Sequence, residues 1–369
     1  MEDILLYILN CYIHEKDVNI SRLNGMEDKD WQKLYLIGKK QGVNGLVFDK
    51  IKSLPKNVAP PKELILKWMS HSISIERHSK VLLKKSIEFA ELMSKYNLQT
   101  IVLKGLTLSK YYPTPWLREY GDLDCYFYEE KEGTISWDDC YKRGNIAAEK
   151  EGLLVKKGFY KHSHIKYKGM EVENHQFSLP VKDGDDVKAM ERELRRLTAQ
   201  PDGLYRIGNT HLMLPSADFN ALFLVAHSMN HFLFESIKLR HVVDWALFIK
   251  TEHKTIDWEN FWKWCDKMQY TRFVKCLNYI CEHHFGMMLP IQIQVEKEKI
   301  IADLSKRILS DIYAEYSLYS QKCSYLTHRI MIVHSYIKGF WKFQHVYQRN
   351  AIWLLTKRTM SMLIHNIKL

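Results

Sequence analysis

The sequence contains no run of about 18 uninterrupted apolar residues and no pair of cysteines spaced C-x-x-C. The first absence argues against a membrane-spanning helix, which needs roughly 20 apolar residues to cross the hydrocarbon core. The second, with seven irregularly spaced cysteines, argues against a disulfide framework and predicts reduced thiols. Glycine and proline number only 16 and 9 in 369 residues, without a repeat or low-complexity tract. This composition is typical of an ordinary globular chain with two or three domains.

The charge is unbalanced toward the basic side. The 54 lysine and arginine residues exceed the 43 aspartate and glutamate residues by 11. Such an excess attracts phosphate-bearing ligands through its long-range field, but it does not distinguish a nucleotide from RNA. The chain opens with Met1-Glu2-Asp3, where a secretory signal would carry positive charge. We therefore expect a cytoplasmic protein that makes no membrane contact.

Residues 1–98 have the periodicity of helices. Apolar residues recur on one helical face up to Tyr96, and Pro55 and Pro60-Pro61 interrupt the pattern earlier. The pattern predicts short helices, a proline-rich connection, and then a long helix from about Lys62 to near Asn97.

The character changes at Gln99, where short β-branched runs alternate with one helical segment. Residues 99–215 are therefore predicted to form a compact α/β unit. Its expected elements are strands at 100–103 and 123–127, a helix at 147–157, and a hairpin of 159–167 and 170–179 turned at Lys168-Gly169.

The charged segment 181–209 is interpreted as an insertion or lid-like loop with a helix near 187–197. Ser216 is then a suitable N-cap, and residues 216–369 are predicted to form a helical domain. The overall prediction is an α+β fold, in which a small mixed sheet is flanked by N-terminal helices and a C-terminal helical bundle.

The most informative motif is Asp122-Leu123-Asp124. Side chains at i and i+2 of a strand emerge on the same face, so both carboxylates are expected to project into one open hollow. Their repulsion is relieved by a bound cation or by a proton, and a hard divalent ion such as Mg²⁺ prefers oxygen ligands. The alternative is a solvated strand end with two aspartates of no functional role.

Three neighbouring features favour a phosphate-binding metal site. Lys104-Gly105 lies between a strand and a helix, where glycine lets the backbone approach a phosphate. Arg118 adds a cation that can bind phosphate in bidentate fashion. Strand alternation places Glu171, Glu173 and His175 on one face, so that either glutamate can supply a third carboxylate.

In this order the motifs resemble the uncharacterised nucleotidyltransferase family, within the DNA-polymerase-β-like nucleotidyltransferase superfamily. The resemblance covers roughly residues 103–244 and rests on Leu103-Lys104-Gly105, Tyr112, Pro113, Arg118, Gly121 to Asp124, Glu173 to His175, His227, His231 and Asp244. The glycine-serine loop of the superfamily is replaced by Lys104-Gly105-Leu106-Thr107, which displaces the hydroxyl to Thr107.

The resemblance implies an enzyme that moves a nucleoside monophosphate from an NTP, such as ATP, onto a hydroxyl of an acceptor. Asp122, Asp124 and Glu173 would hold a pair of Mg²⁺ or Mn²⁺ ions, and Glu173 would help to deprotonate the hydroxyl. Glu173 is preferred to Glu171 because His175 follows it as in the family pattern. The implied nucleotide-binding residues are Lys104, Gly105, Thr107, Arg118, His175 and His227.

Other interpretations remain open at this stage. The chain can be a catalytically silent member of the fold that binds a nucleotide or a partner, or a basic RNA-binding protein. His227 and His231 share a helical face with apolar residues and suit a packed bundle equally well. Trp258, Trp262 and Cys265 follow the spacing of a buried helix face rather than a base-stacking platform. Scattered lysines between residues 342 and 368 favour a solvated face.

Overall fold

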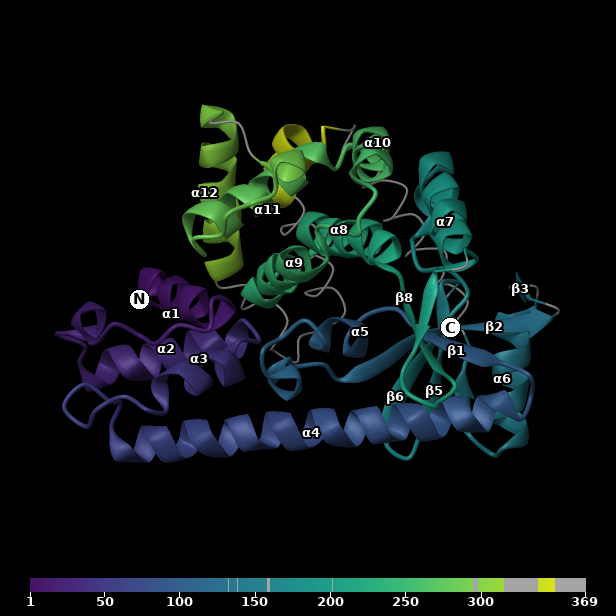
Figure 1. The fold of residues 1–369 in the computed structure, drawn as a ribbon, viewed down its shortest axis with the longest axis horizontal. Helices are drawn as coiled ribbons and strands as arrows, with labels where there is room; N and C mark the ends of the chain where they lie inside the picture. Colours follow the sequence, from purple (N-terminus) through teal and green to yellow (C-terminus); the bar gives the residue numbers. More distant parts are fainter. Residues whose placement is uncertain are drawn as a thin grey trace, which may run out of the picture.

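The computed structural model describes residues 1–131, 133–137, 139–157, 160–200, 202–294, 298–314 and 338–348. Helix α4 (Lys62–Ser94) runs along one side of the molecule, with the N-terminal helices beside its first turns and the sheet beside its last turns (Figure 1). Its buried residues recur every three or four positions from Leu64 to Met93, which is the pattern of a helix with one packed face. The predicted long helix is thereby confirmed.

The N-terminal helices form a small layer against the start of α4. They are α1 (Glu2–Ile13), α2 (Asp28–Lys40) and α3 (Asn44–Ile51). Trp68 of α4 is fully buried in this layer, and its indole Nε1 donates to the carbonyl of Asn44 at 3.0 Å. The predicted short helices before a proline-containing connection are confirmed.

The described strands form one mixed sheet in the order β4-β5-β6-β2-β1-β8-β7, with β3 paired to β2. Strand β2 runs antiparallel to β1 and parallel to β6, and β1 runs parallel to β8. The bounds are β1 (Gln99–Val102), β2 (Asp122–Lys131), β3 (Thr134–Ser136), β4 (Leu154–Lys156), β5 (His162–Tyr167), β6 (Met170–His175), β7 (Leu204–Arg206) and β8 (Leu212–Pro215). The predicted α+β class and mixed sheet are confirmed.

The hairpin of β5 and β6 turns where the sequence predicts it. Lys168 and Gly169 both have positive φ, 48° and 78°, which suits a tight two-residue turn between antiparallel strands. The helix predicted at 147–157 was placed too late, because α6 spans Cys140–Lys150 and β4 follows it. The helix was hard to predict because glycine has a low helix propensity and Gly144 lies inside α6. Packing requires this glycine, since a Cβ at position 144 would lie 2.2 Å from the ring of Phe127.

The charged segment 181–209 contains the helix predicted near 187–197, but it is not a lid-like loop. It contains a short 3-10 turn η3 (Val181–Asp183), helix α7 (Asp185–Thr198) and strand β7, which pairs with β8. The apolar face of α7 packs on α8 (Ala217–Phe234) and α10 (Trp258–Met268). Glu191 of α7 is buried and accepts hydrogen bonds from the backbone amides of Ser178 and Leu179 at 3.0 Å. These contacts fix α7 to the loop that follows β6.

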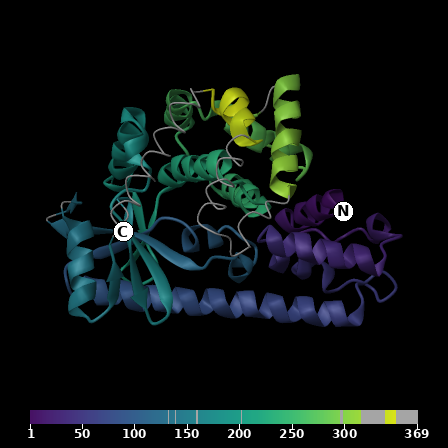
Figure 2. The same ribbon diagram turned by 180° about the vertical axis from the view of Figure 1, so that it is seen from behind.

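Helices α8 and α9 (Leu239–Glu252) occupy the middle of the molecule, between α4 and the outer helices α11 (Thr271–His283) and α12 (Lys299–Tyr313), in both ribbon views (Figures 1 and 2). Ser216 caps α8 as predicted, since its Oγ accepts from the amide of Phe219 at 3.3 Å. None of the described helices is both long and apolar enough for a bilayer crossing.

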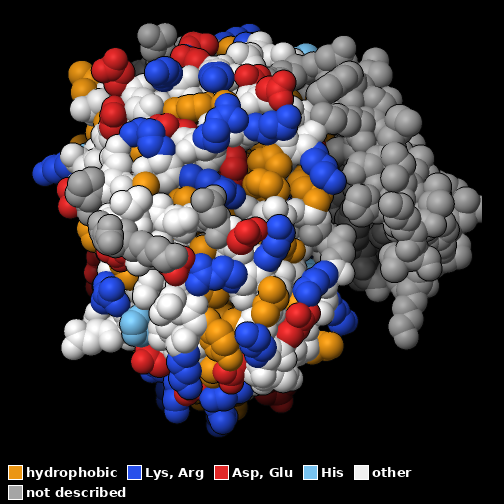
Figure 3. Space-filling view, turned by 90° about the vertical axis from the view of Figure 1, so that its right-hand side faces the viewer, with side chains coloured by type: hydrophobic (Ala, Val, Ile, Leu, Met, Phe, Trp, Pro, Cys, Tyr) orange, Lys and Arg blue, Asp and Glu red, His pale blue; other side chains and the backbone are white. Residues whose placement is uncertain are grey.

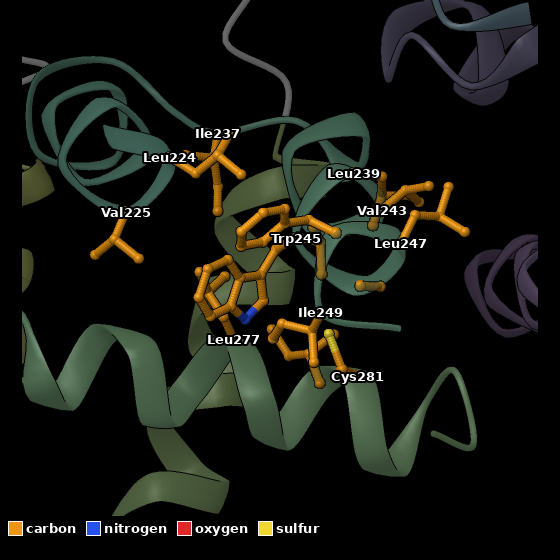
Figure 4. Close-up of a cluster of buried hydrophobic side chains, with 14 of the residues drawn as sticks. Leu224, Val225, Ile237, Leu239, Val243, Trp245, Leu247, Ile249, Leu277 and Cys281 are labelled. Atoms are coloured by element: carbon orange, nitrogen blue, oxygen red, sulfur yellow. The ribbon is translucent and has the colours of Figure 1, made fainter. Parts of the chain in front are cut away.

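Aromatic side chains form the core of these helices. Trp245 of α9 lies amid Leu277, Ile249 and Cys281 (Figure 4), and its Nε1 donates to Asn278 at 2.8 Å. Trp258 and Cys265 are buried, so the predicted packing role of this face is confirmed. The basic stretch begins in the short π-helical segment η6 (Lys342–Tyr347), where Lys342 is buried in an ion pair with Asp311. Residues 349–368 of that stretch lie outside the described residues.

Candidate active site

Three carboxylates converge where β2 and β6 run side by side. The parallel register places Glu173 beside Asp124, and the side chains of Asp122, Asp124 and Glu173 each offer an oxygen within 4.8 Å of the others. Glu171 lies beside Asp122 in the register, but its carboxylate is directed to His164, with 3.1 Å between Oε1 and Nδ1. The structure therefore brings together the preferred acidic set, with Glu173 rather than Glu171.

The two aspartates differ in accessibility. Asp122 lines a cavity, whereas Asp124 is only 2% exposed. Lys104 Nζ and His175 Nε2 each lie 3.1 Å from Oδ1 of Asp124. Burial raises the pKa of Asp124, but the His175 hydrogen bond and the Lys104 charge outweigh it, so the pKa is lowered. The expectation that both aspartates project into an open hollow is wrong for Asp124, because Lys104 from the loop after β1 and His175 from β6 lie against it.

Lys104 and Gly105 connect β1 to the short helix α5 (Leu106–Ser109), and both line the cavity. Burial lowers the pKa of Lys104, but the charges of Asp124 and Asp122 raise it by a larger amount. The pKa of Lys104 is therefore above its usual value. Lys104 is thus a fixed positive charge beside the carboxylates. Gly105 has φ 66°, in the left-handed region that glycine adopts without strain.

His175 positions the carboxylates. Its Nδ1 lies 3.1 Å from the carbonyl of Phe177, and its Nε2 lies 3.3 Å from Oε2 of Glu173 in addition to its contact with Asp124. Burial lowers the pKa of His175, but the bonds to Asp124 and Glu173 raise it more, giving a net increase. A ring that donates from both nitrogens is cationic. The expected nucleotide contact is not found, because His175 is absent from the described residues that line the cavity.

The acidic set fits a hard divalent cation. Oδ2 of Asp124 is buried and has no hydrogen-bond partner among the described residues. Burial and the charge of Asp124 raise the pKa of Asp122 by more than the charge of Lys104 lowers it. An ion with oxygen ligands would satisfy both the unpartnered atom and the repulsion.

A cavity of about 690 Å³ adjoins the carboxylates and lies within the size range of small-molecule sites. Helix α4 contributes to one wall and α8 and α9 to others, while Lys104, Gly105 and Asp122 lie where the cavity meets the sheet. Its polar lining is rich in nitrogen-bearing side chains, namely His71, His78, Lys104, Arg118, His227, His231, Lys238, Arg240 and His241.

Two predicted phosphate ligands have other partners. Arg118 Nε and Nη2 donate to the two oxygens of Asp244 at 2.7 and 2.8 Å, so its fork is occupied. Tyr112 donates its hydroxyl to the same carboxylate at 2.6 Å. Thr107 is fully buried, and its Oγ1 donates to the carbonyl of Val102 at 2.8 Å. The structure therefore corrects the expected bidentate phosphate grip of Arg118 and the expected hydroxyl contact of Thr107.

His227 borders the cavity, as the family pattern implies, within a cluster of histidines. Its ring centroid lies 4.5 Å from that of His231 and 6.2 Å from that of His241. Burial and then the charge of His231 hold the pKa of His227 well below 6.5. The sequence analysis missed His241 and Arg240, although Arg240 and Asp244 are separated by one helical turn of α9.

The sequence analysis also missed His162 of β5 and Lys161, the residue before this strand. Nε2 of His162 lies 3.9 Å from Oε1 of Glu173, and burial lowers the pKa of His162 to about 4. Burial lowers the pKa of Lys161 as well, although the charges of Asp124 and Glu173 oppose the shift. Alternation along the predicted hairpin was the signal that could have located His162.

The depressed pKa of His227 predicts a pH-dependent stability. An unfolded histidine titrates near 6.5, so below that pH the unfolded chain gains a proton that folded His227 resists. The free energy of unfolding is therefore expected to fall from pH 6.5 to 5. In His227→Gln this fall should be smaller by roughly 1–2 kcal/mol. Urea unfolding of both proteins at the two pH values measures the difference, and equal falls would contradict it.

A family model described as uncharacterised nucleotidyltransferase matches residues 27–286. Searches of curated proteins and of solved structures returned no match. The matched range includes α4, the sheet, α8, α9 and the carboxylates described above.

Proposed function

Because the chain belongs to the uncharacterised nucleotidyltransferase family, we propose that it transfers a nucleoside monophosphate from an NTP to a hydroxyl of an acceptor. The observation that carries the proposal is the convergence of Asp122, Asp124 and Glu173 on two parallel strands beside a cavity. Family membership supports nucleotidyl transfer in general, and the carboxylate geometry supports dependence on a divalent metal.

Asp122, Asp124 and Glu173 would hold Mg²⁺ or Mn²⁺. When bound, such ions neutralise phosphate charge and lower the pKa of a bound hydroxyl. His175 keeps Asp124 and Glu173 ionised and oriented through its bonds to both carboxylates. These positions are set before substrate arrives, and preorganised charge of this kind supplies much of the catalytic effect in phosphoryl transfer.

In the proposed reaction, the acceptor oxygen attacks the α-phosphorus and the bond to the β-phosphate oxygen breaks. The hydroxyl proton passes to Glu173, whose pKa is lowered by the His175 bond despite its burial, so that it is ionised at neutral pH. Pyrophosphate is the leaving group. Lys104 is protonated, lines the cavity and lies next to Asp124, so it is suited to stabilise the negative charge of the phosphates.

The cavity is the proposed nucleotide site. Asp122 and Lys104 both line it, so a triphosphate that reaches them occupies the cavity at its sheet end. The cavity is also lined by His227 and His231 of α8 and by His241 of α9. Burial lowers the pKa of His227 and of His241 well below 6.5, so these rings are neutral at pH 7 and can exchange hydrogen bonds with a ligand.

One observation counts against a general RNA-binding surface on the face shown in Figure 3. There, the described Lys and Arg side chains are interspersed with Asp, Glu and hydrophobic side chains. A nucleic-acid surface is expected to cluster its basic residues along one stripe or patch. Lys104, which lies next to Asp124, instead lines the cavity.

Thermal and urea unfolding with each NTP, with and without Mg²⁺ or Mn²⁺, tests the proposal. An NTP present at 100 times its Kd is expected to stabilise the chain by about 2.7 kcal/mol, and only when metal is present. Equal stabilisation by NTP without metal would indicate the catalytically silent alternative. Metal-independent stabilisation by RNA that weakens steeply with salt would favour the RNA-binding alternative.

A further inference from the structure

A second set of potential metal ligands lies next to the three carboxylates. Among the described residues, two groups of three or more histidine, cysteine or acidic side chains bring their ligand atoms within 4.8 Å of one another. One group is the acidic set, and the other consists of His162, Glu173 and His175. The histidines of the cavity do not form such a group in the described part of the chain. Glu173 belongs to both sets.

The second set is built on the β5–β6 hairpin. His162 and His175 are direct partners in its antiparallel register, and their ring centroids lie 5.0 Å apart. Their Nε2 atoms approach different oxygens of Glu173, at 3.9 Å for His162 and 3.3 Å for His175. Two imidazole nitrogens and one carboxylate thus converge from adjacent strands, and rigid strands place ligands more reproducibly than loops do.

The surroundings of His175 are those of a metal-ligating histidine. Its Nδ1 is directed to the carbonyl of Phe177 at 3.1 Å, which orients the ring. A metal ion bound at Nε2 would displace the proton that this nitrogen otherwise donates to Asp124 and Glu173. Metal-bound histidines usually donate their other ring nitrogen to such a group. The side chain of Asp124 is 2% exposed, and its Oδ2 has no hydrogen-bond partner among the described residues. Asp124 Oδ1 is the nearest additional ligand, 3.1 Å from His175 Nε2.

We propose that His162, Glu173 and His175 form a binding site for one transition-metal ion of the zinc class, distinct in donor chemistry from the carboxylate set. Imidazole nitrogen favours Zn²⁺, Co²⁺, Ni²⁺ and Cu²⁺, whereas Mg²⁺ prefers oxygen ligands. Two histidines with one glutamate is a ligand set that holds Zn²⁺ in other proteins. The site does not depend on nucleotidyl transfer, although Glu173 links it to the proposed function.

Cobalt(II) titration of the full chain without Mg²⁺ provides the test, because Co²⁺ replaces Zn²⁺ and has visible absorption bands that report its ligands. We expect one Co²⁺ per chain with bands of nitrogen-oxygen coordination. Loss of an outer-shell partner typically lowers metal affinity about 10–100-fold. Because His162 is a direct ligand in this proposal, His162→Gln is expected to lower the Co²⁺ affinity by more than that. His164→Gln is the matched control on the same strand, outside the ligand group, and should bind as the original chain does.

Asp122→Asn separates this inference from the proposed function. It removes a carboxylate of the acidic set only, so Co²⁺ binding should persist even though Mg²⁺-dependent NTP binding is lost. Unchanged Co²⁺ affinity in His162→Gln, or loss of binding in His241→Gln instead, would overturn the inference. Anomalous scattering from zinc-soaked crystals gives a check that needs no variant. A peak between His162 and His175 supports the site, and a peak elsewhere alone refutes it.

Discussion

Asp122→Asn is expected to abolish Mg²⁺-dependent NTP binding and to lower turnover at least about a hundredfold, since metal stabilisation of a phosphoryl transition state is worth several kcal/mol. Asp122 is the member of the acidic set that lines the cavity. The substitution keeps the shape of the side chain and removes its charge. Turnover is measured as pyrophosphate release with saturating acceptor once one is identified, and NTP binding by calorimetry before that.

The same substitution should leave stability unchanged or increase it. Burial and the charge of Asp124 raise the pKa of Asp122, which means that the folded chain pays for keeping this carboxylate ionised. Asparagine removes that cost, so activity and stability are expected to move in opposite directions, as is common for functional residues. Loss of NTP binding together with a large loss of stability would indicate a structural role instead.

Glu171→Gln is the matched control. Glu171 lies beside Asp122 in the strand register, has a 37% exposed side chain and contacts His164 rather than the acidic set. It is expected to bind Mg²⁺ and NTP as the original chain does. If Glu171→Gln lost NTP binding and Asp122→Asn kept it, the assignment of the carboxylates would be wrong.

The local geometry of the acidic set could be predicted because it follows from two periodicities. Strand alternation alone places Asp122 and Asp124 on one face. The two-residue turn at Lys168-Gly169 sets the register of the hairpin, so that His162 is opposite His175 and His164 is opposite Glu173. The position of His162 could therefore have been predicted from the same turn, by following the alternation of side chains along the strand before it.

The burial of Asp124 could not be predicted from local pattern. It depends on Lys104, in the loop after β1, and His175, at the end of β6, which lie 20 residues before and 51 residues after Asp124 in the chain. Short motifs specify which side chains share a face, but the side chains that cover that face are determined by how strands pair. Thr107 illustrates the same limit, since its hydroxyl donates a hydrogen bond to the carbonyl of Val102 and closes the turn after β1.

Arg118 was misinterpreted for a related reason. An arginine four residues before Asp122 suits a phosphate, but its actual partner, Asp244, is 126 residues away on α9. Only the packing of α9 against the loop before β2 brings the two together. The family pattern contained both residues without indicating that they pair with each other.

Breaking this ion pair is expected to destabilise the fold strongly. The side chains of Arg118 and Asp244 are 6% and 3% exposed, and burial lowers the pKa of Arg118 less than Asp244 raises it. Arg118→Met leaves the Asp244 carboxylate buried, with the Tyr112 hydroxyl as its remaining described hydrogen-bond partner. The free energy of unfolding is expected to fall by about 3–5 kcal/mol, the usual cost of an uncompensated buried charge. Urea unfolding measures this loss.

The double variant Arg118→Met, Asp244→Leu distinguishes a structural pair from a phosphate ligand. Removing both charges eliminates the uncompensated carboxylate, so most of the lost stability should return, because apolar pairs often replace buried ion pairs at little cost. NTP affinity of the refolded double variant should then match that of the original chain, since the guanidinium fork is occupied by Asp244. A double variant that recovers stability but loses NTP affinity tenfold or more would return Arg118 to the phosphate-binding residues.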